Sequence, residues 1–125
     1  MSGLVLDRGA LIAFERCDRK VVGHIARAID NGESISVPAG VVGQTWRDGR
    51  TQVRLARLLG SEECKIVALD DLAARKAGEL CRVTSTSDVI DASVVMCARQ
   101  MAGLVLTSDS DDLLRLDPRL GVIAI

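Results

Sequence analysis

Aromatic side chains are nearly missing from this chain of 125 residues, which contains one Phe, one Trp and no Tyr. That scarcity argues against a protein that binds nucleic acid by stacking bases on platforms of Tyr or Phe. Apolar residues nevertheless make up 48% of the chain. We therefore expect an aliphatic core, which a chain of this length can bury without disulfides or a structural metal.

An excess of charge of either sign is also missing, since the formal net charge is −1. Bulk attraction to nucleic acid is then weak, and any RNA contact needs a local basic patch or a metal ion. No apolar stretch approaches the roughly 20 residues that cross a bilayer. The apolar opening is interrupted by Asp7 and Arg8, which leaves no hydrophobic region for a secretory signal. We expect a cytoplasmic protein that does not associate with membranes.

The cysteines form neither a zinc motif nor a disulfide framework. No two of them stand in a C-x-x-C pair, and the single histidine, His24, is not at zinc-binding spacing from any of them. We expect free, buried thiols in a reducing compartment at the four positions Cys17, Cys64, Cys81 and Cys97.

Short apolar runs alternate with segments of helical spacing along the chain. Strands are expected at residues 3–6, 34–37, 65–69, 104–106 and 122–124. Helices are expected at residues 10–14, 20–29, 39–47, 51–59, 70–80 and 88–101, with a break at Asp48 and Gly49. This alternation predicts one α/β domain with a mostly parallel sheet of about five short strands and helices on both faces.

Acidic residues fall where the predicted strands end. Asp7 follows the first strand and Asp109 follows the fourth, while Asp88 opens the preceding helix with Asp91 on the same face. Ligands of open parallel sheets bind beyond the carboxyl ends of the strands. Two carboxylates about 6 Å apart repel by roughly 3 kcal/mol at an effective dielectric near 20, and a divalent cation reverses that sign. The pattern predicts a metal site.

Helix capping is the competing explanation for these acids. Asp88 and Asp91 fit an N-cap and the third helical position, and Ser108 with Asp111 fits a capping box. Asp7 is harder to explain in this way, because a lone buried carboxylate after an apolar strand is costly. Recurrence of such acids at one edge of one sheet favours a site.

A phosphoacceptor domain of the receiver type also carries acids at strand ends. That class requires adjacent acids after the first strand and a lysine after the last. Here the first strand is followed by Asp7 alone, and no lysine occurs beyond Lys76. The sequence therefore argues against it.

Four segments resemble the ordered motifs of PIN domains, and in particular of the VapC toxins of bacterial toxin–antitoxin pairs. They are residues 4–13 (LVLDRGALIA), 37–42 (VPAGVV), 87–92 (SDVIDA) and 106–109 (LTSD). The resemblance runs from Leu4 to Leu116. It implies a PIN-like three-layer sandwich that forms a single domain over residues 1–125.

The resemblance also implies a function. Such proteins are metal-dependent endoribonucleases that hydrolyse RNA phosphodiester bonds and act as the toxin of a toxin–antitoxin system. It carries over Asp7, Asp88 and Asp109 as the catalytic and metal-binding carboxylates for Mg²⁺ or Mn²⁺, with Asp91 as a helper. The implied partners are an RNA substrate, a cognate antitoxin and a second copy of the chain in a homodimer.

The chain departs from the family pattern at Gln44, where such proteins commonly have a Glu. A neutral amide offers a carbonyl oxygen but cannot act as a base, so metal affinity is expected to fall. Asp91 or Asp112 would then compensate, and Ser108 is a further polar residue expected to support the site. The alternative function is a degenerate PIN domain that binds RNA or an antitoxin without efficient cleavage. A plain solvent-facing role for Gln44 also stays open.

Arginines supply the basic groups that RNA binding would need. Arg50, Arg54 and Arg57 have the spacing of one helical stripe, and Arg8 directly follows Asp7. The stripe fits either phosphate binding or a solvated helix face. Trp46 is expected in core or interface packing. The residues predicted to contact RNA are Arg8, Arg47, Arg50 and Arg54.

Overall fold

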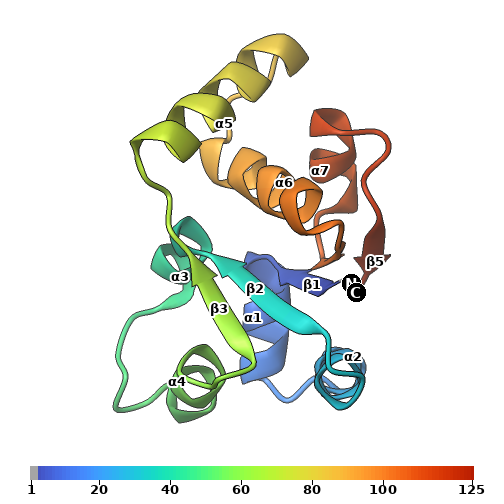
Figure 1. Ribbon diagram of the computed structural model, residues 1–125. Helices are drawn as coiled ribbons and strands as arrows, with labels where there is room; N and C mark the ends of the chain where they lie inside the picture. Colours follow the sequence, from blue (N-terminus) through green and yellow to red (C-terminus); the bar gives the residue numbers. More distant parts are fainter. Residues whose placement is uncertain (1–2) are drawn as a thin grey trace.

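The computed structural model describes residues 3–125, which form five strands and seven helices (Figure 1). The strands are β1 (Gly3–Leu6), β2 (Ser34–Pro38), β3 (Cys64–Val67), β4 (Leu104–Thr107) and β5 (Val122–Ala124). The helices are α1 (Arg8–Glu15), α2 (Arg19–Asp30), α3 (Ala39–Thr45), α4 (Val53–Leu59), α5 (Asp71–Thr84), α6 (Val89–Met101) and α7 (Ser110–Leu116).

The five strands form one parallel sheet in the order β3-β2-β1-β4-β5. Leu4 in the central strand is in register with Ile35 of β2 on one side and Leu104 of β4 on the other. The chain builds the sheet outward from β1 through β2 and β3, and then returns to the other side of β1. The order of the strands therefore switches between β1 and β4, which is where ligands of such sheets bind.

Helices cover both faces of the sheet, so the predicted three-layer α/β architecture is confirmed (Figure 1). Helix α6 packs against β1 and β2 on one face, and α1, α2 and α4 lie on the other. Helix α5 packs mainly on α6, outside the sheet layer. The core is aliphatic, as expected, with Val5, Leu6, Ile35 and Leu106 fully buried.

Most predicted elements are observed, and the differences lie in short polar segments. Helix α7 was not predicted as an element, because its seven residues open with Ser-Asp-Asp and resemble a loop. The break after α3 is longer than predicted, since α3 ends at Thr45 and α4 begins only at Val53. The apolar residue Val89 is 38% exposed at the start of α6.

The cysteines are free, as predicted, but not all are buried. Cys81 and Cys97 are buried, Cys64 is half-buried, and Cys17 is exposed where α1 turns into α2. Burial raises the pKa of the Cys64 thiol to about 11. Within residues 3–125, no helix combines the length and the apolar character needed to cross a membrane.

Candidate functional site

Five carboxylates share one small cavity beside the switch point of the sheet. The cavity has a volume of about 160 Å³ and opens where β1 and β4 end. Four helices supply its lining, so residues far apart in the sequence meet there. The lining residues are Asp7, Arg8, Val41, Gln44, Asp88, Asp91, Val94, Asp109 and Asp112.

Asp7 both caps a helix and faces this acidic pocket. It is 4% exposed, and its Oδ1 accepts a hydrogen bond from the backbone N–H of Ala10 at 3.0 Å, which caps α1. Its Oδ2 accepts a hydrogen bond from the hydroxyl of Thr107. Burial raises the pKa of Asp7 above its ordinary value, the hydrogen bonds from Thr107 and Ala10 act to lower it, and the nearby charge of Asp109 raises it. Capping and site formation are therefore compatible for this residue.

Thr107, the last residue of β4, connects two of the acids. It is fully buried, and its hydroxyl donates to Asp7 while accepting the backbone N–H of Asp109 at 2.8 Å. One hydroxyl thus fixes both the Asp7 carboxylate and the turn that carries Asp109. Sequence reasoning missed this residue. The available signal was a hydroxyl residue in the final position of a buried strand, directly before Ser108 and Asp109.

Asp91 lies among the other carboxylates of the pocket. Burial is the largest cause that raises its pKa to about 6, followed by the charges of Asp88, Asp112, Asp109 and Asp7. Asp91, predicted as a helper, therefore lies within electrostatic reach of the four other acids of the pocket.

Asp88 has the role that the capping explanation predicted. It is the N-cap of α6, and its Oδ1 accepts the backbone N–H of Asp91 at 2.9 Å. Its side chain lines the cavity but is exposed. The geometry therefore places Asp88 at the rim and Asp91 further in, whereas the sequence analysis gave Asp88 the ligand role.

The predicted capping box of Ser108 and Asp111 does not form. Helix α7 begins at Ser110 with Asp109 as its N-cap, and no side-chain hydrogen bond caps it. Ser108 instead lies against Gly9, where a Cβ would overlap the serine Oγ. Glycine at this position allows the turn after β4 to approach the start of α1.

The predicted RNA-contacting arginines lie in two different places. Arg8 lines the acidic pocket, whereas Arg47, Arg50 and Arg54 do not. The prediction that Arg50, Arg54 and Arg57 form a stripe along one helix is wrong, because Arg50 precedes α4 and lies in the turn before it. Arg50 pairs with Asp48 at 3.5 Å, and Arg54 lies over the Phe14 ring, 5.2 Å from its centroid.

The acidic pocket fits a hard divalent cation by the chemistry of its donors. Carboxylate and amide oxygens are the ligands that Mg²⁺ and Mn²⁺ prefer, and the pKa of Asp91 is raised by burial first and then by the negative charges of its four acidic neighbours. As the side chains of residues 3–125 stand, no three Asp, Glu, His or Cys groups are grouped closely enough to hold one ion. That Asp7, Asp88 and Asp109 share one cation stays a prediction.

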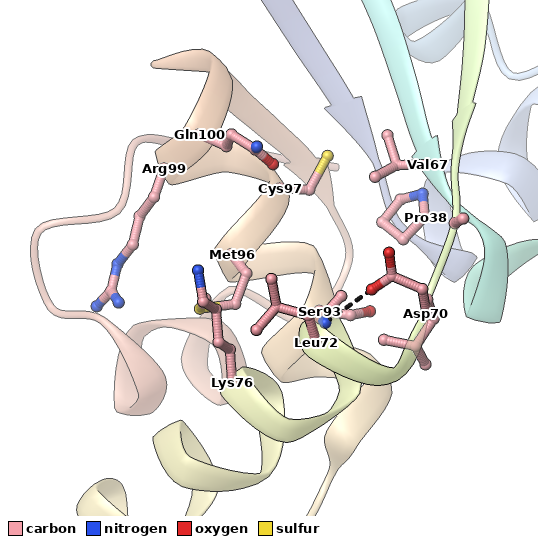
Figure 2. A pocket seen from close by; sticks show the side chains of 13 residues that line it. Pro38, Val67, Asp70, Leu72, Lys76, Ser93, Met96, Cys97, Arg99 and Gln100 are labelled. Carbon is pink, nitrogen blue, oxygen red and sulfur yellow. Dashed lines mark hydrogen bonds between the residues drawn. The ribbon is translucent and has the colours of Figure 1, made fainter.

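A larger cavity lies elsewhere, between the start of α5 and the face of α6 (Figure 2). We call it the α5–α6 groove. Its volume is about 610 Å³. Apolar side chains such as Leu72 and Met96 line it, with Asp70 and Lys76 among them. It contains no cluster of acids and shares no lining residue with the acidic pocket.

Comparison with known proteins gives one family and several similar structures. The family model described as PIN domain matches residues 4–117. VapBC2 from Rickettsia felis, bound to a DNA fragment from its promoter, is 13% identical at a TM-score of 0.72, covering 98% of each chain. FitAcB from Neisseria gonorrhoeae is 16% identical at a TM-score of 0.62, covering 96% of each chain.

A third structure, FitAB bound to the IR36 DNA fragment, is 16% identical at a TM-score of 0.66 and covers 97% of this chain and 94% of the other. No curated protein matches the chain in sequence. At these identities, the structural likeness shows the fold alone.

Proposed function

The chain belongs to the PIN domain family, and from this premise we propose that it is a metal-dependent endoribonuclease, the toxin of a toxin–antitoxin pair. Its substrate would be RNA and its reaction the hydrolysis of phosphodiester bonds. The observation that carries the proposal is the gathering of five carboxylates from three segments of the chain around one cavity at the switch point of the sheet.

We assign Asp7, Asp91 and Asp109 as the residues that would hold Mg²⁺ or Mn²⁺, with Asp88 and Asp112 at the rim. The choice of Asp91 over Asp88 follows from its surroundings, since all four other acids act on its carboxyl group. A divalent cation in such a site stabilises the negative charge that builds up on the phosphate oxygens.

The remaining polar residues would position the acids and the substrate. Thr107 holds the Asp7 carboxylate through its hydroxyl, and the same oxygen anchors the turn before Asp109. Arg8 lines the pocket, and among residues 3–125 it forms no ion pair with an acid. A guanidinium in this position would bind an RNA phosphate through two parallel hydrogen bonds.

Cleavage of a labelled RNA in the presence of Mg²⁺ tests this function. Asp7→Asn and Asp91→Asn keep the size of the side chain and remove its charge, so each should lower the cleavage rate at least a hundredfold, as expected when a charge-stabilising group is lost. Asp30→Asn, at the exposed end of α2, is the matched control and should cleave at the parent rate. A parent-like rate for either pocket variant would refute the assignment.

A non-cleaving PIN domain is the second candidate, and Gln44 is the residue that favours it. Its side chain lines the pocket, where it brings a neutral amide among the acids. If this amide limits activity, Gln44→Glu should create or sharply raise RNA cleavage. A parent protein that already cleaves efficiently, with no gain in the Gln44→Glu variant, would exclude this candidate.

A cognate antitoxin is the protein partner that we propose. The structures of similar fold are toxin–antitoxin complexes, two of them bound to DNA. We further propose that the chain acts in the cytoplasm, where its RNA substrates would be found.

We also propose that the chain forms a homodimer through the α5–α6 groove. Leu72 is 63% exposed in the groove, and Figure 2 shows Lys76 and Asp70 on opposite sides of the Leu72 side chain. A two-fold interface must be self-complementary, because both copies contribute the same surface. If one residue contacts a second residue of the other copy, then the second residue of the first copy contacts the first residue of the other. An apolar surface between a base and an acid satisfies this condition, because Lys76 of one copy can meet Asp70 of the other.

A further inference from the structure

The segment between α3 and α4 presents the only tryptophan of the chain to solvent. Trp46 was expected in core or interface packing, but it is 37% exposed. Its indole lies against Gly49, where a Cβ would come within 2.9 Å of the ring atom Cζ2. A glycine at this position therefore lets the loop close under the ring while part of the indole stays accessible.

Gln52 fixes this loop from beneath. The side chain is 8% exposed, and its Oε1 accepts the backbone N–H groups of Arg47 and Asp48 at 2.6 and 2.9 Å. Its Nε2 donates to the carbonyl of Thr45 at 2.9 Å and to Glu15 of α1 at 3.0 Å. One buried amide thus joins α3, the loop and α1, so that the exposed tryptophan is held on an ordered loop.

Arginines are frequent in the segment that carries this tryptophan. The guanidinium of Arg47 donates to the carbonyl of Trp46 at 2.6 Å and to that of Gly43 at 3.0 Å, which fixes a positive charge at the end of α3. The Arg50 side chain is 92% exposed. Residues 46–57 contain four arginines and one acid in a chain whose net charge is −1. We call this region the Trp46 surface; its members are Trp46, Arg47, Arg50, Arg54 and Arg57.

We propose that the Trp46 surface is a second RNA-binding site, which takes single-stranded RNA by stacking a base on the indole while the arginines contact phosphates. An accessible aromatic ring among cations is the arrangement by which proteins bind single strands without reading their sequence. A docked protein would call for a broader apolar face, and Val53 is the only other large apolar residue exposed between positions 46 and 57. The inference rests on the proposed function in so far as RNA is the substrate.

The site is separate from the acidic pocket, since no member of the Trp46 surface lines that cavity. RNA binding here therefore needs neither a divalent cation nor cleavage. RNA binding to the Trp46 surface can therefore be measured in the absence of divalent cations, when the proposed nuclease does not cleave.

The single tryptophan supplies a direct readout. A 12-nucleotide oligouridylate is titrated into the protein in EDTA, and base stacking should quench the tryptophan fluorescence. Anisotropy of the labelled oligonucleotide then compares variants: Trp46→Ala should weaken binding about 5- to 100-fold, as the loss of one stacked base does elsewhere. Arg50→Ala should lower the slope of log Kd against log salt concentration by roughly 0.7, which is the contribution of one phosphate contact on a single strand.

Three further variants keep the test independent of folding and of catalysis. Gly49→Ala retains the tryptophan and every charge but displaces the indole, so the quenching should fall. Arg19→Ala, at the exposed start of α2, removes an arginine outside the Trp46 surface and should bind as the parent does. Asp91→Asn should bind with unchanged affinity while cleavage is lost.

Unchanged fluorescence on adding RNA, or equal affinities for the parent and the Trp46→Ala, Gly49→Ala and Arg50→Ala variants, would overturn the proposal and leave this surface to a protein partner. Binding without any cleavage by the parent would instead refute the nuclease function and leave the Trp46 surface standing.

Discussion

At the scale of single residues, burial and mutual repulsion both act on the carboxylates of the acidic pocket. Five carboxylates line a cavity of about 160 Å³, and the pKa of Asp91 is raised to about 6 from an ordinary value of 3.8. A carboxyl group whose pKa is higher in the folded than in the unfolded chain stabilises the fold fully below the unfolded pKa. That contribution is lost as the pH rises through the folded pKa. The metal-free protein should therefore lose stability between about pH 4 and pH 6 through this group.

Asp91→Asn is expected to stabilise the metal-free protein while removing its activity. The substitution takes away a partly buried charge, so the free energy of unfolding at pH 7 should rise by about 1 kcal/mol. Urea denaturation in EDTA at pH 5 and pH 7 measures this change, and the difference between the two pH values should shrink in the variant. A variant less stable than the parent at pH 7 would show that Asp91 is held by favourable contacts instead.

Thr107→Val should act on Asp7 through its pKa. The valine keeps the shape but loses the hydroxyl that donates to Asp7, a contact that lowers the pKa of this carboxyl group. The pKa of Asp7 should then rise, and the acidic limb of the pH–rate profile should move to higher pH. Loss of the buried hydrogen bonds should also destabilise the fold by roughly 1–3 kcal/mol. Ser108→Ala is the control, and an unmoved profile in the Thr107→Val variant would contradict this role.

At the scale of helices and strands, the sequence predicts what depends on apolar patterning. β1 and β5 have the predicted bounds, because short apolar runs between polar residues leave little choice. The predicted arginine stripe is wrong because three arginines at helical spacing do not reveal where a helix begins, and α4 begins only at Val53. Gln52 explains the delay, since its side chain binds the backbone N–H groups of the loop before α4.

The acids at strand ends could likewise be predicted, but their relative importance could not. Asp7 and Asp109 follow buried strands in the sequence, and the parallel sheet brings both to one edge. Whether Asp88 or Asp91 points inward depends on the rotation of α6 about its axis, which the packing of that helix sets. The hydroxyl of Thr107 joins residues 100 positions apart, so no local pattern shows the contact.

Substitutions of Asp88 separate its capping role from a catalytic one. Asp88→Ala removes the cap of α6 and should lower the free energy of unfolding by about 1 kcal/mol, whereas Asp88→Asn still accepts the N–H of Asp91 and should be nearly neutral. Because we place Asp88 at the rim, Asp88→Asn should retain a larger share of RNA cleavage than Asp91→Asn. Thermal unfolding and cleavage rates are measured on the same preparations. Equal loss of activity in Asp88→Asn and Asp91→Asn would show that Asp88 also belongs to the residues that hold the cation.

At the scale of the whole molecule, the acidic pocket, the Trp46 surface and the α5–α6 groove have no residue in common. The pocket lies where β1 and β4 end, the Trp46 surface extends from the end of α3 along α4, and the groove lies beside α5. This division allows cleavage, RNA binding and self-association to be altered one at a time.

Self-association through the groove is tested by reversing one charge. Lys76→Glu would face Asp70 of the second copy, so the dimer should dissociate at least about tenfold more readily, as like charges across an interface do. Adding Asp70→Asn to this variant should restore dimerisation, because asparagine removes the repulsion and still caps α5. Lys20→Glu on α2 is the control for net charge, and sedimentation velocity gives the dimer constant. A monomeric parent, or an unchanged constant for Lys76→Glu, would contradict this interface.

We propose that Asp7, Asp91 and Asp109 share a divalent cation, and calorimetric titration of Mn²⁺ at pH 6 would detect its binding. Because the pKa of Asp91 is about 6, part of the protein carries a proton on this residue at pH 6, and a bound cation should displace it. The released proton is taken up by the buffer, so the measured heat should change with the ionisation enthalpy of the buffer. We predict saturable binding with proton release in the parent, and loss of both in Asp91→Asn. Absence of binding in the parent, or equal affinity and equal proton release in Asp91→Asn, would contradict the claim.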